Sequence, residues 1–258
     1  MTSSIDTDYG RQFARWYDRL FDPSAAEETA KVLAGCHPAP DTGALELGVG
    51  TGRVALPLAR MIGAVTGVDS SRDMLAVLAE ANARTGGRVT GVHADMRTYQ
   101  DTRSYALVYA VCATLNQLLR PEDQREAVHR AAGLLAPGGK LFIEAHHRPA
   151  VTEALHMGRP HVTFFTPYPE PGTGLQTHSA IAGDGRTWQC SQIWYEKDGT
   201  TRVGTEYSRL LVPEEVHTWA EEAGLSLDCP REGYGDWALN TATEQSATFI
   251  CVYTRPAP

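Results

Sequence analysis

The sequence predicts an α/β fold in which a doubly wound, mostly parallel sheet is followed by a region of antiparallel strands. Short apolar runs alternate with segments that are apolar at helical spacing, which is typical of parallel strands joined by crossover helices. The first of these apolar runs breaks into a glycine-rich loop. Residues 162–212 lack this rhythm and consist of alternating runs and turns, as antiparallel strands do.

The amino-terminal region predicts helices ahead of the first strand. Residues 8–21 carry aromatic and leucine side chains at helical spacing, which indicates an amphipathic helix. Tyr9 and Tyr17 lie about two turns apart in that helix, so both hydroxyls can point to one side. Residues 25–35 predict a second helix, and the two prolines in 36–42 indicate a linker into the first strand.

A glycine loop follows the first predicted strand, residues 44–47. Gly48, Gly50 and Gly52 allow a sharp turn and a close approach of the backbone to a ligand. Arg53 stands where the third glycine of a dinucleotide-binding loop would be, so the spacing differs from that of nucleotide sites with G-x-G-x-x-G. The next strand, residues 64–68, ends in Asp69, whose carboxylate can accept hydrogen bonds from the hydroxyls of a ribose.

Polar residues follow the later strands. A strand at 105–112 leads to Asn116 and Gln117, which could orient a substrate or cap the following helix. A helix at 122–135 ends in L-A-P-G-G-K, and the next strand, residues 140–145, leads to His146 and His147. Ligands of open α/β sheets lie beyond the carboxyl ends of the strands, so either histidine could be a general base, or could simply cap a helix or face solvent.

Three features together resemble the class I methyltransferases that use S-adenosylmethionine. They are the glycine loop, the acidic residues Asp69 and Asp95 after two strands, and the L-A-P-G-G-K segment. The likeness covers about 35–148 and 213–254, and predicted strands at 225–229 and 247–253 match that family's reversed edge hairpin. Members of the family usually begin the strand at 105–112 with Phe-Asp, and here Ala106 stands in place of the Asp.

The resemblance implies a cofactor site for S-adenosylmethionine. In that family the glycine loop accommodates the carboxypropyl chain, a residue such as Met74 packs on the adenosine, and a carboxylate such as Asp95 accepts from the adenine amino group. The full cofactor-binding set expected on this basis is Tyr17, Glu46, Gly48, Gly50, Gly52, Arg53, Asp69, Ser70, Met74, Asp95, Met96 and Ala110.

The resemblance also implies four segments and a small-molecule acceptor. We expect an N-terminal helical cap at 1–35, a cofactor-binding core at 36–150, a β-strand lid at 151–212 and the rest of the core at 213–258. Amine N-methyltransferases of this family use tyrosines of such a cap, which makes Tyr17 and Tyr9 catalytic candidates alongside His146. Substrate-binding candidates are Asn116, Gln117 and His147.

We therefore expect N-methylation of an amine on a small secondary metabolite. The alternatives are O-methylation with His146 or His147 as base, and a cyclase or binding protein that holds the cofactor without methylating. The net charge of −8 and a pI near 5.6 argue against a nucleic-acid partner. No apolar signal or spanning run is present and the five cysteines lack C-x-x-C spacing, so we expect a cytoplasmic protein with no membrane partner and no metal. The sequence leaves a homo-oligomer open.

Overall fold

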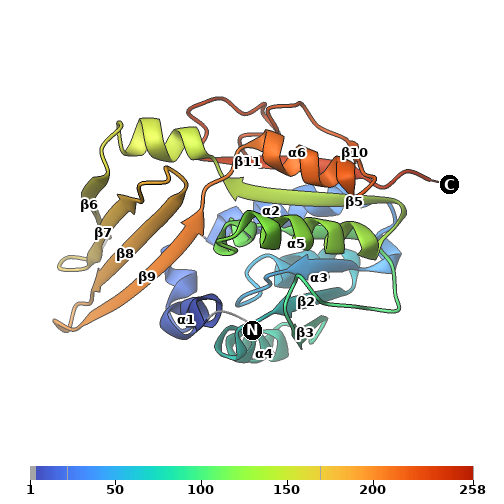
Figure 1. Cartoon of the computed structure of the whole chain (residues 1–258). Coiled ribbons are helices and arrows are strands. Elements are labelled where there is room, and N and C mark those ends of the chain that lie inside the picture. The colour runs from blue at the N-terminus through green and yellow to red at the C-terminus, as the bar shows by residue number, and fades with distance from the viewer. Residues whose placement is uncertain (1–3, 22, 169, 258) are drawn as a thin grey trace.

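A seven-stranded sheet forms the centre of the protein, seen here in a computed structural model that describes residues 4–21, 23–168 and 170–257 (Figure 1). The strand order is β10-β11-β5-β4-β1-β2-β3. Neighbours pair in parallel except at β11, which runs antiparallel to both β5 and β10. The predicted sheet is therefore confirmed. Its strands are β1 (Ala44–Leu47), β2 (Val65–Asp69), β3 (Val89–His93), β4 (Tyr105–Ala110), β5 (Leu135–His146), β10 (Ser226–Leu227) and β11 (Thr248–Thr254).

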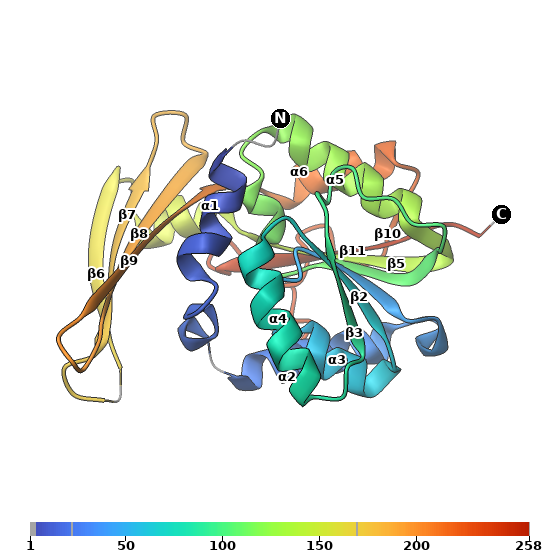
Figure 2. The same cartoon turned by 90° about the horizontal axis from the view of Figure 1, so that it is seen from below.

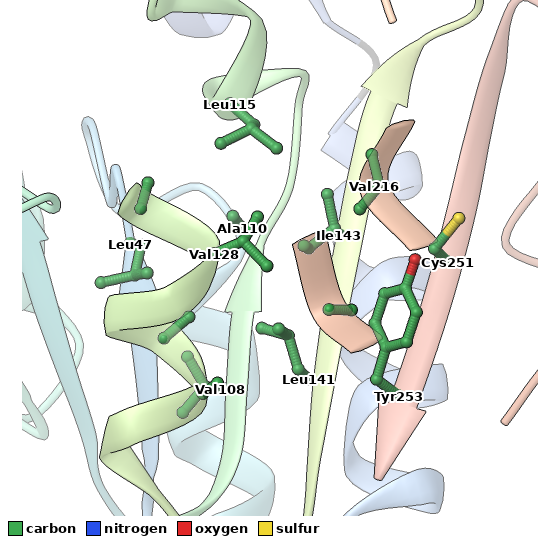
Figure 3. Packing of buried hydrophobic residues seen from close by; sticks show 14 of the residues in the cluster. Leu47, Val108, Ala110, Leu115, Val128, Leu141, Ile143, Val216, Cys251 and Tyr253 are labelled. Carbon is green, nitrogen blue, oxygen red and sulfur yellow. The ribbon is translucent and has the colours of Figure 1, made fainter. Parts of the chain in front are cut away.

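Helices cover both faces of this sheet, because the strands bury side chains on both sides. Leu107 and Tyr109 of β4 belong to the apolar cluster under α2 and α3, whereas Val108 and Ala110 belong to the cluster under α5 and α6 (Figures 1 and 3). Continuous apolar strands of this kind are expected in a parallel sheet with two covered faces. The helices are α2 (Pro23–Cys36), α3 (Ala55–Ile62), α4 (Arg72–Arg84), α5 (Pro121–Leu134) and α6 (Pro213–Glu222).

The L-A-P-G-G-K segment lies inside β5 instead of before it. Leu135 pairs with Tyr105, and the next pair is Lys140 with Leu107, so the residues between them form an irregularity in the strand. Gly138 has a φ of 75° there, which favours glycine. The strand therefore begins earlier than the predicted 140–145, although its glycines do turn the chain back into the sheet.

A second, four-stranded antiparallel sheet stands beside the carboxyl ends of the parallel strands (Figures 1 and 2). We call it the lid sheet. The antiparallel region predicted after the parallel core is thus present. Its strands, in the order β6-β7-β8-β9, are β6 (His161–Pro167), β7 (Gly174–Ile181), β8 (Thr187–Tyr195) and β9 (Thr201–Arg209).

The amino-terminal segment lies between the lid sheet and α4 (Figure 2). The prediction of a single helix at 8–21 is wrong in one respect. The helix α1 (Ser4–Phe13) ends early, and a separate 3-10 turn, η1 (Tyr17–Leu20), follows it. The turn starts where Trp16 packs edge-on against Trp194 of the lid sheet, with ring centroids 5.7 Å apart. This tertiary contact directs the chain away from the helical path.

No helix within the described residues is long and apolar enough to cross a membrane. Within the same ranges, no group of three or more His, Cys, Asp or Glu side chains is arranged to hold a metal ion.

Candidate cofactor and acceptor site

The glycine loop after β1 is held in a tight turn by backbone hydrogen bonds. The amides of Gly48 and Val49 both donate to the carbonyl of Val68, at 2.7 and 3.0 Å. Gly48 and Gly50 have φ values of 72° and 56°, in the left-handed region. A Cβ at Gly48 would lie 2.2 Å from Cγ2 of Thr114, whereas one at Gly50 would meet no atom within 4 Å. The loop therefore leaves an open cradle at Gly50.

The carboxylate of Asp69 connects this loop to the end of β2. One oxygen accepts from the amide of Gly50 and the other from the amide of Ser71, both at 2.8 Å. Burial raises the pKa of this carboxyl, and the two amide hydrogen bonds oppose the rise. Each oxygen keeps a second lone pair. Asp69 can thus hold the loop and still accept hydrogen bonds from a ligand.

These groups line one cavity, which we call the cofactor cavity. Its floor is the glycine loop, one wall is the start of α4, and its roof is the amino-terminal segment. The cradle at Gly50, the Asp69 carboxylate and the apolar Met74 side chain fit the carboxypropyl chain, ribose and adenine of S-adenosylmethionine. The predicted residues that line it are Tyr9, Tyr17, Gly48, Gly50, Asp69, Ser70, Met74, Met96 and Gln117.

Other predicted cofactor-binding residues lie outside this cavity. Ala110 packs in the core beneath α5 (Figure 3), and Gly52, with a φ of 85°, packs toward Leu78 of α4. Glu46 is buried in β1, where the Tyr109 hydroxyl donates to it at 3.0 Å and burial raises its pKa to about 8. The structure thus gives these three residues positions that support the fold outside the cavity lining, and their contact with a cofactor stays a prediction.

Asp95 and Arg53 lie beside the cofactor cavity. Asp95 lines a small recess together with Asp69, Ser70 and Met96. Burial favours a high pKa for Asp95, but hydrogen bonds from Arg97 outweigh it and lower the pKa. The guanidinium of Arg53 stacks 4.1 Å from the ring centre of Phe21 and donates to Sγ of Cys112 at 2.8 Å.

A second cavity, which we call the acceptor cavity, adjoins the first. Both cavities are lined by Tyr9, Tyr17, Cys112 and Gln117, so they meet at these residues. The acceptor cavity extends from there to the end of β5 and to the lid sheet. Its remaining lining includes Leu20, Phe21, Arg53, Glu144, His146, Leu175, Gln192, Glu206 and Trp237.

The two tyrosines meet edge to face at the junction of the cavities. Their ring centroids are 6.2 Å apart, with the ring planes at 76°. Burial raises the pKa of both phenols, so both hydroxyls stay protonated near neutral pH. The break between α1 and η1 brings them together, rather than the shared helix face that we expected.

The two predicted histidines have different surroundings. His146 lines the acceptor cavity and packs edge-on against Trp188, with ring centroids 5.0 Å apart. Burial lowers its pKa to about 4. His147 lines neither cavity, because its ring packs against Phe249 and its Nδ1 lies 3.2 Å from the carbonyl of Ser246. The structure thus places His147 outside both cavities, and its contact with a substrate stays a prediction.

Asn116 also lies away from both cavities. Its side chain is fully buried, donating to the carbonyl of Arg209 at 2.8 Å and accepting from the amide of His146 at 3.0 Å. Both ends of the amide are thus used to fasten the end of β9 to the end of β5. This position corrects the predicted substrate contact, whereas Gln117, the next residue, does line both cavities.

Glu206, a carboxylate of β9 that lines the acceptor cavity, was not among the predicted site residues. Burial raises its pKa to about 7, and a hydrogen bond with Gln117 acts against that rise. The alternation of β9 contained a signal, because Gly204, Glu206 and Ser208 lie on one face and two of these are small. A charged side chain between small neighbours on one face of a strand has room to enter a cavity.

Comparisons with known proteins agree with this geometry. Residues 44–139 match the family model of a methyltransferase domain. A protein of Geobacillus sp. (strain WCH70) that is named as a methyltransferase is 31% identical over 141 residues, which are 52% of this chain and 56% of that protein. The match thus spans little more than half the length of this curated relative.

Solved structures resemble nearly the whole chain. The CcbJ methyltransferase from Streptomyces caelestis is 28% identical, with 98% of this chain and 99% of that chain covered and a TM-score of 0.86. The sugar N-methyltransferase KedS8 from a Streptoalloteichus species shares the fold at 17% identity, with 94% and 91% covered and a TM-score of 0.68. Fold, loop and comparisons agree on the class: the core is similar to methyltransferase domains, and the glycine loop and Asp69 form a cavity that fits S-adenosylmethionine.

Proposed function

We propose that the whole chain transfers a methyl group from S-adenosylmethionine to the amine of a small acceptor in secondary metabolism. The acceptor cavity carries this proposal, because it adjoins the cofactor cavity at Tyr9 and Tyr17 and is bounded by the lid sheet. Solved structures with this fold include an amino pentose methyltransferase from Micromonospora echinaspora and the sugar N-methyltransferase KedS8. Amino sugars are therefore the first acceptors to test.

The cofactor supplies a methyl group on a sulfonium, which an acceptor nitrogen can displace in line. The protein contributes position and shielding from water. Tyr9 and Tyr17 stand where the two ligands would meet, and their aromatic faces and hydroxyl oxygens can stabilise positive charge. Gln117, which also borders both cavities, can orient the acceptor.

The surroundings of His146 favour an amine over a hydroxyl. A hydroxyl must lose its proton as it attacks, which calls for a base whose pKa is near the working pH. With its pKa lowered to about 4, His146 is neutral at pH 7 but is a weak proton acceptor. An amine that is bound unprotonated already presents a lone pair. O-methylation with His146 as the base is therefore the less favourable alternative, because that base is too weak.

The defining experiment is a panel of amino sugars, amino acids and phenols incubated with S-adenosylmethionine. We expect a gain of one methyl mass in an amine, with stoichiometric release of S-adenosylhomocysteine, measured by mass spectrometry. A product of unchanged mass would support a cyclase, and binding of S-adenosylhomocysteine without any product would support a binding protein.

Substitution of His146 then separates the two kinds of acceptor. For an amine, His146→Gln should change the single-turnover rate by much less than the roughly 10²- to 10⁴-fold of general-base catalysis, and Tyr17→Phe should lower it more. His147→Gln is the matched control, because that ring lies outside both cavities. Loss of turnover in His146→Gln alone, with S-adenosylhomocysteine still bound, would instead establish O-methylation.

A further inference from the structure

Glu206 is directed from the lid sheet toward the amino-terminal segment and the acceptor cavity. Along β9 it shares a face with Gly204, where an added Cβ would lie 2.6 Å from the ring of Phe13 in α1. The amide of Thr205, between them, donates to Oε1 of Gln12 at 2.9 Å and fixes the strand against α1. The side chain of Glu206 lines the acceptor cavity and hydrogen-bonds with Gln117.

The groups around this carboxylate are neutral when protonated. Tyr9 faces it from α1, Tyr17 from η1 and Cys190 from the neighbouring strand β8. Across the described residues, no ion pair reaches Glu206. Farther round the same cavity lie the charged or titratable side chains of Arg53, Cys112, Glu144 and His146.

None of these groups forms an ion pair with Glu206. The Arg53 guanidinium stacks on Phe21 and donates through Nη2 to Cys112, while its buried Nε has no hydrogen-bond partner among the described residues, and Glu144 accepts from the Cys112 amide at 2.7 Å. His146 is neutral, because burial lowers its pKa. Glu206 is therefore a half-buried carboxylate that lines a cavity without a counter-ion, an arrangement that is costly unless the group binds a proton or a cation.

We propose that Glu206 receives the acceptor as an ammonium ion and takes its proton before methyl transfer. This inference rests on the proposed function, because it assumes an amine acceptor. It deepens that function by assigning the group that recognises the amine. A protonated amine beside Glu206 would also lie near the faces of Tyr9 and Tyr17, which attract cations.

Two transfers occur in sequence, first of a proton to Glu206 and then of a methyl group to the amine. An N–H bond of the ammonium breaks and an O–H bond forms on Glu206, which leaves a neutral amine with a free lone pair. That lone pair forms the new N–C bond as the S–C bond breaks, and the bonding electrons remain on sulfur in S-adenosylhomocysteine. The methylated product carries its positive charge on nitrogen, and Glu206 returns its proton to solvent when the product leaves.

Glu206→Gln tests this role, because glutamine keeps the size and can keep a hydrogen bond with Gln117 while it removes the charge. Calorimetry in the presence of S-adenosylhomocysteine measures two binding constants. One is for an amine of the panel that the wild-type protein methylates, and the other is for the N-acetyl derivative of that amine, which carries no charge. We expect wild-type protein to prefer the amine by about 10- to 150-fold, as for a hydrogen bond to a charged group, and the variant to lose that preference.

The pH profile and two further variants complete the test. In the pH profile of kcat/KM, the fall in rate at low pH that reports the proton acceptor should be lost in Glu206→Gln. The double variant Gln192→Glu with Glu206→Gln places a carboxylate on the adjacent strand β8 and should restore part of the amine preference. Glu170→Gln is the control, since Glu170 belongs to the lid region but is exposed and pairs with Lys197. S-adenosylhomocysteine binding reports on folding in every variant.

The outcomes separate the two proposals. A Glu206→Gln protein that binds S-adenosylhomocysteine normally and keeps both the amine preference and the acid limb overturns the role of Glu206 but leaves amine methylation standing. A wild-type protein that methylates phenols and no amine overturns the proposed function, and this inference with it. If Glu206→Gln does not fold, Glu206→Met, which also removes the charge and keeps a similar length, replaces it, and an unchanged amine preference in that variant would likewise contradict the inference.

Discussion

Asp69 shows how one side chain can serve both the fold and the ligand. Its two oxygens bind the amides of Gly50 and Ser71, which fixes the cradle and the start of α4 relative to each other. Asp69 also lines the cofactor cavity, where we propose that its remaining lone pairs accept hydrogen bonds from a ribose. Removing the carboxylate should therefore remove ligand hydrogen bonds and loosen the loop at the same time.

We predict that Asp69→Ala weakens binding of S-adenosylhomocysteine by about 1.5 to 3 kcal/mol, the range for hydrogen bonds to a charged group. Isothermal titration calorimetry measures the change. Asp73→Ala is the control, because Asp73 is an exposed residue in the first turn of α4 and lines no part of the cofactor cavity. Equal affinities in wild-type protein and Asp69→Ala would show that the cofactor is held elsewhere.

Among the elements, α1 packs closely against its neighbours because glycines stand at the contacts. It packs against α4 through Gly10, where an added Cβ would lie 2.0 Å from Oγ of Ser71. That oxygen is the N-cap of α4 and accepts from the amide of Met74. On its other side, α1 meets β9 at Gly204. The amino-terminal segment can thus cover the cofactor cavity because small residues let it approach both neighbours.

We predict that Gly10→Ala lowers affinity for S-adenosylhomocysteine at least about tenfold, because the new methyl group must displace the Ser71 cap or lift α1. Helix propensity alone would favour alanine by roughly 0.5 to 1 kcal/mol. Gly35→Ala in α2 isolates the effect of helix propensity, since a Cβ added at that position would meet no atom within 4 Å. Chemical denaturation should show Gly35→Ala to be stabilised, and unchanged ligand affinity in Gly10→Ala would contradict the packing argument.

The core elements could be predicted from sequence because each depends on a local signal. Gly48, Gly50 and Asp69 belong to one strand-loop-strand pattern, and the structure brings them into one cavity. Glu206 could not be assigned, because its position depends on the pairing of β8 with β9 and on the packing of the lid sheet against α1. Likewise, Asn116 looked like a ligand group until its two long-range hydrogen bonds, to residues of β5 and β9, were visible.

For the whole molecule, two acids and a histidine whose pKa values are shifted by desolvation make stability depend on pH. Glu206 and Glu46 have folded-state pKa values near 7 and 8, raised from the ordinary 4.5 by burial. The folded state therefore holds protons that the unfolded state releases, and stability falls as pH rises from about 4.5 to 8. His146 acts in the opposite direction, because its pKa is lowered to about 4 and the unfolded state takes up the proton first, so stability falls as pH drops from 6.5 to 4.

This linkage predicts that Glu206→Gln stabilises the ligand-free protein at pH 8.5 by about 1 to 3 kcal/mol more than it does at pH 5, because the glutamine has no proton to lose. Urea denaturation at both pH values measures the difference in unfolding free energy. Glu170→Gln should show no such difference, since that carboxylate is exposed. A pH-independent effect of Glu206→Gln would mean that the carboxylate already has a compensating partner in the ligand-free protein. Stabilisation at high pH together with loss of amine binding would instead show that this half-buried charge is kept for the acceptor at the expense of stability.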